Sequence, residues 1–460
     1  MADQTPTRVN RNRRIILFPL PYQGHINPML QLANILYSKG FSITIFHTNF
    51  NAPNTSNYPH FTFKFILDND PNDQRYCNLP LTGMASFDRI FVFNDHGADS
   101  LRHELDLEIS KKDEPPVSCL ITDALWYFTQ SVADSVNLPR LVLRTSSLFC
   151  FLVYSSMPIL HDRGYLGLAN DNTTVKQVLA EFPVLKVKDI MKMGFKSSTD
   201  AIGGVLNNMV KQTKASSGII WNSFKELEET EFEMVVRDIK APSFLIPFPK
   251  HFTGSSSSLI EQDRTFFPWL DQQPPNSVVY VSFGSTTNVD EKDFLEIAHG
   301  LVDSGQPFLW VVRPGYVNGS TWIEPLTDGL VGKNSRIVKW TPQQEVLAHK
   351  AIGAFWTHNG WNSTLESVCE GVPMILSPFF GDQALNARYM SDVLKVGVYL
   401  GNVWHKEDIA NAIRRIMVDN EGEEIRERAK VIKQKLDVSL IKGGSSYESL
   451  ESLVSYVSSL

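Results

Sequence analysis

The alternation of short apolar runs with helical patterns is the feature that most constrains how this chain can fold. In the first half, five runs rich in Ile, Val, Phe and Leu have the length of buried strands. They are Ile15–Phe18, Ser42–His47, Phe61–Ile66, Cys119–Thr122 and Arg140–Leu143. Strands that alternate with helices form parallel sheets, because each parallel pair needs a crossover connection. The first half therefore predicts one parallel α/β sheet.

A well-marked helix lies between the first two runs. Asn27 suits the N-cap, Pro28 suits the first helical position, and Gly40 suits the C-terminal end. Four apolar residues repeat at helical spacing on one face: Met29, Leu32, Ala33 and Leu36. Strand, helix and strand at this length predict a βαβ unit.

The second half repeats this organisation. Its expected strands are Ser277–Phe283, Phe308–Val312, Arg336–Trp340, Ala354–Thr357 and Met374–Leu376. We therefore expect two doubly wound α/β domains that face each other across a cleft. The first spans 1–250 and the second 266–440, with a serine-rich linker at 251–265. A helix at 441–460 is expected to pack back on the first domain.

Composition excludes several classes of protein. The chain has 43 Lys and Arg against 50 Asp and Glu, a net charge of −7 at pH 7, which disfavours a nucleic-acid binder. Its four cysteines stand far apart and match no zinc or redox motif. The most apolar stretch, Leu148–Leu160, is too short to span a bilayer, and the polar N-terminus has no signal-peptide pattern. We expect a cytoplasmic protein with reduced thiols.

A run at 357–363, Thr-His-Asn-Gly-Trp-Asn-Ser, separates an expected strand from an expected helix. Free backbone N–H groups and the helix dipole favour an anion at such a turn, and Gly360 allows close approach. Three residues of the run add side-chain donors: His358, Asn362 and Ser363. The alternative is an ordinary capped turn, since Ser363 and Glu366 also fit a capping box.

Two further segments of the chain carry side chains that are suited to ligand binding. Trp340 ends an expected strand, where its ring can stack on a flat base, although a core tryptophan is the alternative. Asp382 and Gln383 offer a carboxylate beside an amide, a pair that suits sugar hydroxyls. The alternative for Asp382 is a helix N-cap. In sequence, these segments offer a base platform, a phosphate pocket and a hydroxyl clamp.

His25 and Asp123 are the candidate proton-transfer pair. His25 lies in the loop after the first strand and Asp123 ends the fourth, and both positions face the cleft of a doubly wound fold. A histidine can accept a proton from a hydroxyl near neutral pH. A carboxylate on its other ring nitrogen fixes the tautomer. On spacing alone, a structural role for both residues remains the alternative.

One competing motif points to a metal. Asp68-Asn69-Asp70 fits the D-x-D pattern with which some enzymes bind a divalent cation. Here it opens a polar loop, and we expect no metal site. The chain has no P-loop and no G-x-G-x-x-G, and it therefore lacks the main signal of an NTPase or a dinucleotide enzyme.

Residues 340–383 read WTPQQEVLAHKAIGAFWTHNGWNSTLESVCEGVPMILSPFFGDQ. This run is similar to the signature box of plant family-1 UDP-dependent glycosyltransferases. Three other segments resemble that family in the same order: PYQGHINP at 21–28, ITDALW at 121–126 and SFGS at 282–285. HTNFNAPNTSNYPHF and the C-terminal tail resemble the subgroup that holds a Stevia glucosyltransferase of steviol glycosides. The resemblance implies the GT-B fold, which consists of two facing Rossmann-like domains.

The resemblance also implies the donor site. Residues implied to bind UDP are Ser285, Trp340, Thr341, Gln343, His358, Gly360, Asn362, Ser363 and Glu366. Trp340 would stack on uracil and Glu366 would hold the ribose. Residues implied to hold the sugar are Thr145, Trp361, Asp382 and Gln383. A final glutamine usually accompanies glucose. Asn359 replaces the family's commoner cysteine, and Thr341 replaces a commoner alanine or valine.

By the same resemblance, His25 and Asp123 form the catalytic dyad of an inverting transferase that uses UDP-glucose and needs no metal or other cofactor. Five residues are expected to wall an apolar acceptor pocket: Tyr22, Trp126, Leu148, Phe149 and Phe380. The first expectation for the acceptor is a steviol-type diterpenoid glycoside, with flavonoid or phenolic O-glucosylation and cytokinin N-glucosylation as alternatives. Alternatives of other classes are a nucleotide-sugar-binding protein and a hydrolase. We expect a monomer without nucleic-acid partners.

Overall fold

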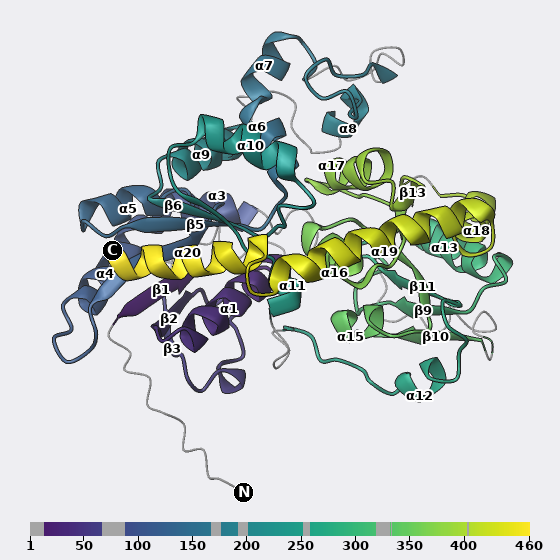
Figure 1. The fold of residues 1–460 in the computed structure, drawn as a ribbon, viewed down its shortest axis with the longest axis horizontal. Helices are drawn as coiled ribbons and strands as arrows, with labels where there is room; N and C mark the ends of the chain where they lie inside the picture. Colours follow the sequence, from purple (N-terminus) through teal and green to yellow (C-terminus); the bar gives the residue numbers. More distant parts are fainter. Residues whose placement is uncertain are drawn as a thin grey trace, which may run out of the picture.

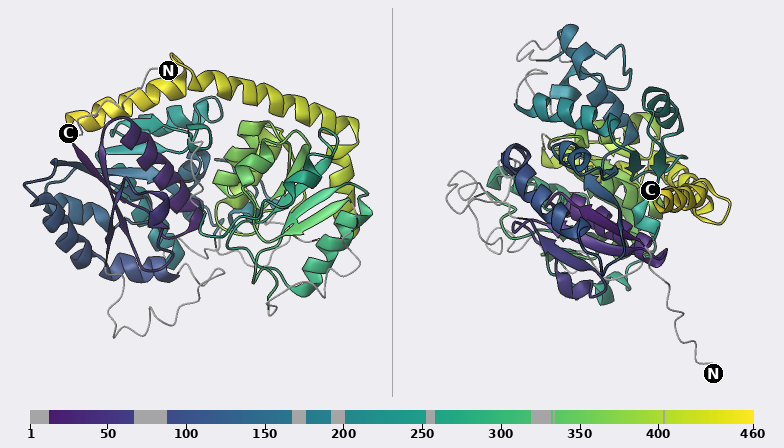
Figure 2. Two further views of the ribbon diagram at one scale, coloured as in Figure 1. Left: turned by 90° about the horizontal axis from the view of Figure 1, so that it is seen from below. Right: turned by 90° about the vertical axis from the view of Figure 1, so that its left-hand side faces the viewer.

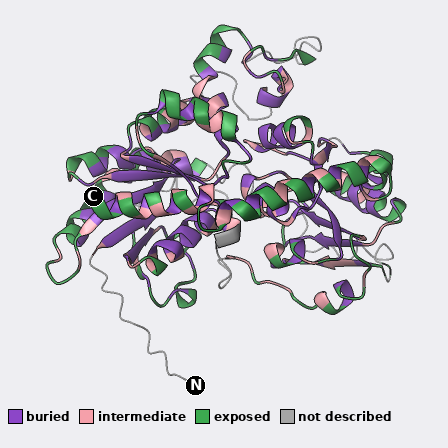
Figure 3. Ribbon diagram, viewed as in Figure 1, coloured by how far each residue is buried: buried purple, intermediate pink, exposed green. Residues whose placement is uncertain are grey.

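The computed structural model describes residues 13–66, 88–166, 176–191, 201–251, 258–318, 332, 334–402 and 404–460. Two α/β halves lie side by side, each built on its own sheet (Figure 1). The central strands of both sheets are buried, the edge strand at Thr62–Phe65 is partly exposed, and the rest of the exposed surface belongs mainly to helices and loops (Figure 3). The predicted pair of doubly wound domains is confirmed.

The first sheet has seven parallel strands in the order β3-β2-β1-β4-β5-β6-β7. Their bounds are β1 Arg14–Phe18, β2 Ser42–His47, β3 Thr62–Phe65, β4 Val117–Asp123, β5 Arg140–Arg144, β6 Gly218–Trp221 and β7 Ser243–Leu245. The five expected strands are present, while β6 and β7 were not anticipated. The order reverses between β1 and β4, which is where a doubly wound sheet opens a binding crevice.

Helices cover both faces of this sheet. They are α1 Gln23–Ser38, α3 Asp88–His96, α4 Ala98–Ile109, α5 Thr129–Ser135, α6 Leu148–Ser155, α7 Met157–Asp162, α8 Val187–Met191, α9 Ala201–Lys214, α10 Glu229–Asp238 and α11 Phe248–His251, with a 3₁₀ turn at Thr55–Asn57. The apolar face of α1 packs against β1, β2 and β4 in one continuous core cluster. The layered arrangement follows from strands that are apolar on both faces.

The helix between β1 and β2 begins earlier than expected. α1 starts at Gln23, and Tyr22 occupies the N-cap position. Asn27 is therefore not the N-cap, and Pro28 lies inside the helix rather than at its first position. Proline has no N–H, so the Gly24 carbonyl four residues earlier lacks its helical partner. Gly40 follows the helix at φ +98°, as a C-terminal glycine should.

The second sheet has six parallel strands in the order β10-β9-β8-β11-β12-β13. Their bounds are β8 Val278–Ser282, β9 Phe308–Val311, β10 Ser335–Val338, β11 Ile352–Thr357, β12 Met374–Leu376 and β13 Gly397–Tyr399. Its helices are α12 Phe267–Leu270, α13 Glu291–Asp303, α15 Gln343–Leu347, α16 Trp361–Glu370, α17 Gln383–Arg388, α18 Lys406–Met417 and α19 Asn420–Leu440, with a π-helical turn at Tyr389–Val393. The five strands expected here are present, and β13 is the addition. The last helix, α20 Ser445–Ser459, packs on the first sheet.

The last two helices run along one side of the molecule and cross from the second half to the first (Figure 2). Leu450, Leu453 and Val457 of α20 join the core cluster around β1 and β4. The Tyr456 hydroxyl donates to the Ser217 carbonyl at 2.6 Å. The two halves are thus tied by a helix as well as by the linker. The exact domain boundaries stay a prediction.

Over the stretches of chain that the structure describes, no helix combines the length and the apolar character that crossing a membrane requires.

Candidate active site

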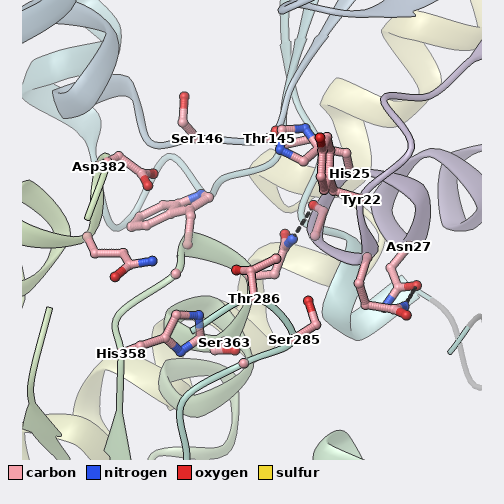
Figure 4. Close-up of a pocket in the computed structure, with 18 of the residues that line it drawn as sticks. Tyr22, His25, Asn27, Thr145, Ser146, Ser285, Thr286, His358, Ser363 and Asp382 are labelled. Atoms are coloured by element: carbon pink, nitrogen blue, oxygen red, sulfur yellow. Dashed lines mark hydrogen bonds between the residues drawn. The ribbon is translucent and has the colours of Figure 1, made fainter. Parts of the chain in front are cut away.

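A cavity of about 1060 Å³ lies between the two halves. Its walls come from segments that follow β1, β4 and β5 in the first sheet and β8 and β11 in the second. His25 and Thr145 lie on one side, with Ser285, His358 and Ser363 across the cavity from them (Figure 4). The carboxyl ends of both sheets therefore open into one shared site.

His25 and Asp123 form a close pair in this cavity. His25 lies in the first turn of α1 and Asp123 ends β4, the strand next to β1. His25 Nδ1 is 2.7 Å from Asp123 Oδ2, and the Asp123 side chain is 1% exposed against 21% for His25. The Leu125 N–H donates to Asp123 Oδ1 at 2.9 Å, which fixes the carboxylate. The pair favours the tautomer with the proton on Nδ1 and leaves Nε2 to accept one.

Thr145 is a second neighbour of the imidazole. It follows the last residue of β5, and its Oγ1 lies 3.1 Å from His25 Nδ1. The family resemblance implies that Thr145 reaches the sugar. In the structure it lines the cavity and contacts the histidine as well.

The turn between β11 and α16 is packed around His358. Gly360 occupies the N-cap position of α16. A Cβ at Gly360 would lie 2.6 Å from His358 Nε2, and one at Gly284 would lie 2.7 Å from it. Both glycines are therefore needed for the imidazole to fit. Desolvation lowers the pKa of His358 to about 4, more than a backbone hydrogen bond with Ser282 raises it, so the ring is neutral at pH 7.

Asn362 joins the two halves. Its Nδ2 donates to the Gly24 carbonyl at 2.5 Å, which is the carbonyl that Pro28 leaves without a helical partner. Its Oδ1 accepts from Asn222 Nδ2 at 2.8 Å. The indole N–H of Trp361 donates to the Asn222 carbonyl at 2.7 Å. The first turn of α16 is thus held against the first turn of α1, which carries His25.

Ser363 and Glu366 do not form the capping box that their spacing allows. Gln343 Nε2 donates to Ser363 Oγ at 2.9 Å and to Glu366 Oε2 at 2.6 Å. Gln344 Nε2 donates to Glu366 Oε1 at 3.2 Å. Burial raises the pKa of Glu366, whereas these two amides lower it. The side chains therefore meet as a polar cluster on the cavity wall and not as a helix cap.

Trp340 and Thr341 both line the cavity. Trp340 is half-buried and its indole N–H donates to Ser258 Oγ at 2.9 Å. Thr341 is 3% exposed, and its hydroxyl lies 2.8 Å from the Tyr280 hydroxyl. Because the Thr341 hydroxyl is already hydrogen-bonded to Tyr280, a ligand would contact Thr341 mainly through its backbone.

Asp382 and Gln383 lie on the cavity wall at the start of α17. Gln383 Oε1 accepts from the Phe379 N–H at 2.9 Å and from the Phe380 N–H at 3.1 Å. The amide nitrogen is then the end of this side chain that can donate to a ligand. Asp382 occupies the N-cap position of α17, as the alternative expected, but its side chain makes no cap bond, and its Oδ2 accepts from Asn386 Nδ2 at 3.1 Å. Burial raises the pKa of Asp382.

Three of the five expected acceptor-pocket residues do not line the cavity, and this part of the prediction is corrected. Trp126 is 1% exposed because its ring packs against Phe18 and its N–H donates to the Pro19 carbonyl at 3.0 Å. Leu148 and Phe149 face core clusters on other sides of α6. Tyr22 and Phe380 do line the cavity.

Residues of α9 supply an apolar wall that sequence analysis missed: Ile202, Val205, Leu206 and Met209. Their helical spacing was the signal that could have found them. Ile90, Phe91 and Leu125 also line the cavity.

The structure describes no cluster of three or more His, Cys, Asp or Glu side chains that could hold a metal ion in the ranges it covers. The Asp68-Asn69-Asp70 motif lies outside the described residues.

Comparisons with known proteins agree on one family. The family model described as "UDP-glucoronosyl and UDP-glucosyl transferase" matches residues 107–432. The chain is 69% identical over the full length of both chains to UDP-glycosyltransferase 76G1 of Stevia rebaudiana. It is 45% identical to UDP-glycosyltransferase 76B1 of Arabidopsis thaliana, covering 96% of this chain and 97% of that one.

Solved structures show the same fold. A Phytolacca americana enzyme complexed with UDP-2fluoro-glucose and pterostilbene has a TM-score of 0.80 at 26% identity, covering 97% of this chain and 99% of that one. Os79 from O. sativa in complex with UDP has a TM-score of 0.78 at 26% identity, covering 96% and 100%. The chain therefore belongs to the UDP-dependent glycosyltransferases, in the plant family-1 group with the GT-B fold, and is an enzyme.

Proposed function

We propose that this enzyme transfers glucose from UDP-glucose to a hydroxyl of an apolar small molecule, with inversion and without a metal. The observation that carries the proposal is the His25–Asp123 pair, held at 2.7 Å in a cavity that both halves line. His25 is the general base and Asp123 stabilises the imidazolium that forms.

The proposed reaction is a single displacement. The acceptor hydroxyl gives its proton to His25 Nε2 while its oxygen forms a bond to the anomeric carbon of glucose. The bond from that carbon to UDP breaks with the electron pair on the phosphate oxygen. The N-terminus of α16, the neutral His358 and the Ser363 hydroxyl favour this charge.

The proposed donor contacts extend over the rest of the cavity. Trp340 stacks on uracil, Glu366 binds the ribose, and Gln343 and the Thr341 backbone orient both. Asn362 and Ser285 complete the diphosphate site. Trp361, Asp382, Gln383 and Thr145 hold the glucose. All of these residues line the cavity, which supports the assignment.

The proposed acceptor is a diterpenoid glycoside. The apolar wall of α9 and the 69% identity to a Stevia relative support this class. Flavonoids or phenolics are the second candidate, because the Phytolacca structure at 26% identity holds pterostilbene. Cytokinin N-glucosylation is the third.

We also propose that the protein is a cytoplasmic monomer. Size-exclusion chromatography would test the oligomeric state, and a fluorescent fusion would test the localisation.

A mass-spectrometric acceptor screen tests the proposal. UDP-glucose is offered with steviol glycosides, flavonoids, simple phenols and cytokinins, in parallel arms with and without EDTA. We expect a glucosylated product in both arms. Activity that disappears with EDTA would overturn the metal-free mechanism. Product only with another UDP-sugar would overturn glucose as the donor.

Substitution of the dyad tests the mechanism. His25→Ala should abolish transfer, by about 10²- to 10⁴-fold or more, since it removes the general base. UDP binding measured by calorimetry should persist, because no proposed UDP contact is changed. Asp123→Asn should also lower kcat, with UDP affinity unchanged. Full activity of the His25→Ala enzyme would contradict the mechanism.

A further inference from the structure

A buried arginine lies in the acceptor half of the cavity. Arg144 is the last residue of β5, where it pairs with Trp221 of β6. Its side chain is 1% exposed and still contributes to the cavity lining. The guanidinium lies 5.1 Å from the ring centre of Phe151 and 5.9 Å from that of Trp221. The next residue, Thr145, contacts His25.

This guanidinium is poorly satisfied. Nη1 donates to the sulfur of Met209 and Nη2 to the Ser146 hydroxyl, both at 2.8 Å. Nε has no hydrogen-bond partner among the described residues. A thioether is a weak acceptor, and an arginine carries five N–H donors. Burial lowers the pKa of Arg144. A buried charge without a partner is costly. The free N–H groups of Arg144 therefore favour a ligand that carries a hydrogen-bond acceptor, above all an anionic one.

Three other buried arginines that the structure describes have more oxygen partners or a carboxylate partner, although the Nε of Arg14 also lacks a hydrogen bond. Arg14 pairs with Glu108 at 2.5 Å, and Arg388 pairs with Asp189 at 3.1 Å. Arg140, on the same strand as Arg144, donates to four oxygen atoms of neighbouring residues. No described carboxylate lies within ion-pair distance of Arg144.

The two charges that act on Arg144 from farther away are already engaged. Asp123 is paired with His25, and Asp382 accepts from Asn386. Neither is therefore a dedicated partner for this guanidinium.

A ligand in the cavity can displace the two side chains that hydrogen-bond to Arg144. Met209 and Ser146 both line the cavity, and methionine is unbranched and adaptable. A carboxylate that displaced the Met209 sulfur would gain charge-assisted hydrogen bonds. Val205 and Ile202, on the same helix as Met209, add apolar side chains to the cavity lining.

We propose that Arg144 is an anion subsite of the acceptor pocket, and that the enzyme favours apolar acceptors which carry a carboxylate apart from the reacting hydroxyl. This inference rests on the proposed transferase function and deepens it, because it names the chemistry of the acceptor. Arg144 binds the carboxylate while the hydroxyl lies at His25.

The first test uses the wild-type chain and matched acceptors. One pair is a hydroxylated diterpene acid and its methyl ester, and the other is ω-hydroxydodecanoic acid and its methyl ester. Calorimetry with UDP present measures the affinity of each compound at neutral pH. We expect the acid to bind about 10- to 100-fold more tightly in at least one pair. Equal affinities in both pairs, tighter esters, or no binding by any compound would overturn the proposal.

The second test removes the charge. Arg144→Met keeps an unbranched chain in the same apolar surroundings, and Arg144→Lys keeps the charge without the planar fork. The methionine variant should lose the preference for the acid and keep its affinity for the ester, and lysine should restore part of the preference. Equal weakening of acid and ester would indicate a structural role and overturn the subsite. An unchanged affinity for UDP shows that the variants are folded. If a variant does not fold, the first test, which uses only the wild-type chain, decides the proposal.

Binding and turnover separate this inference from the proposed function. Acids that bind through Arg144 but give no product with UDP-glucose would leave the subsite standing and contradict the transferase proposal. Glucosylation of acid and ester with equal kcat/KM and equal affinity would support the transferase proposal and overturn the anion subsite.

Discussion

At the scale of single residues, the protein holds polar groups out of water and thereby sets their charge. Glu228 is buried beside the start of α6. Its carboxyl accepts from the Phe149 N–H at 2.9 Å and from the Ser223 hydroxyl at 2.5 Å. Burial outweighs these bonds and raises the pKa of Glu228 to about 7. The folded state therefore holds a proton that the unfolded chain releases at lower pH.

Glu228→Gln should make stability less dependent on pH. Because the folded pKa is raised, the stability that Glu228 contributes is fully present below the unfolded pKa and is lost as pH rises toward about 7. Between pH ~5 and ~8 the loss is on the order of 2 kcal/mol in the wild type. Urea unfolding of both proteins at the two pH values measures it. The same pH dependence in wild type and variant would contradict the assignment.

At the scale of elements, the proline inside α1 has a consequence for the second half of the molecule. Pro28 leaves the Gly24 carbonyl free, and Asn362 at the start of α16 donates to it at 2.5 Å. Asn222, just after β6, donates to Asn362 and accepts from the Trp361 indole. The start of α16 in the second half is thereby aligned with the first turn of α1, which carries His25. Asn222 is a positioning residue, since it does not line the cavity.

Asn222→Ala should weaken UDP binding by about 3- to 10-fold, since one buried hydrogen bond to Asn362 is lost. The Trp361 bond to the backbone of Asn222 is retained, so the fold should persist. Calorimetry of UDP binding is the measurement. The control is a double-mutant cycle: in an Asn362→Ala background, the same change should have little further effect. Additive losses would contradict the positioning role.

At the scale of the whole molecule, the two halves are joined by a buried ion pair as well as by α20. Arg388 of α17 donates from Nε to Asp189 of α8 at 3.1 Å, and the Asp189 side chain is fully buried. The Arg388 guanidinium also lies 4.0 Å above the ring centre of Tyr399. The ion pair between α8 and α17 therefore helps to fix the position of one half relative to the other.

Arg388→Met should destabilise the protein by about 3–5 kcal/mol, because it leaves the Asp189 carboxylate buried without its partner. Asp189→Asn in the same chain should recover much of this loss, since the uncompensated charge is removed. Thermal unfolding of the two variants and the wild type measures both effects. If the double variant is less stable than Arg388→Met alone, the ion-pair argument fails.

Local patterns in the sequence determined the class of the fold. Strands such as Ser42–His47 and Met374–Leu376 were located to the residue, because continuous apolar runs between turn signals encode buried parallel strands. The short strand β13 and the true start of α1 were missed. Their positions depend on pairing with β12 and on the turn at Tyr22, which are contacts outside the local pattern.

The sequence by itself also located segments that border the cavity, at His25 and in the 340–383 run. Only the tertiary structure decided which side chains share the cavity: it excluded Trp126, Leu148 and Phe149, and it admitted Arg144 and the wall of α9. Periodicity tells which face of an element is apolar, but it does not tell whether that face meets a core or a cavity. That choice depends on how the two sheets and their helices pack together, which is a sum over contacts between residues far apart in the chain.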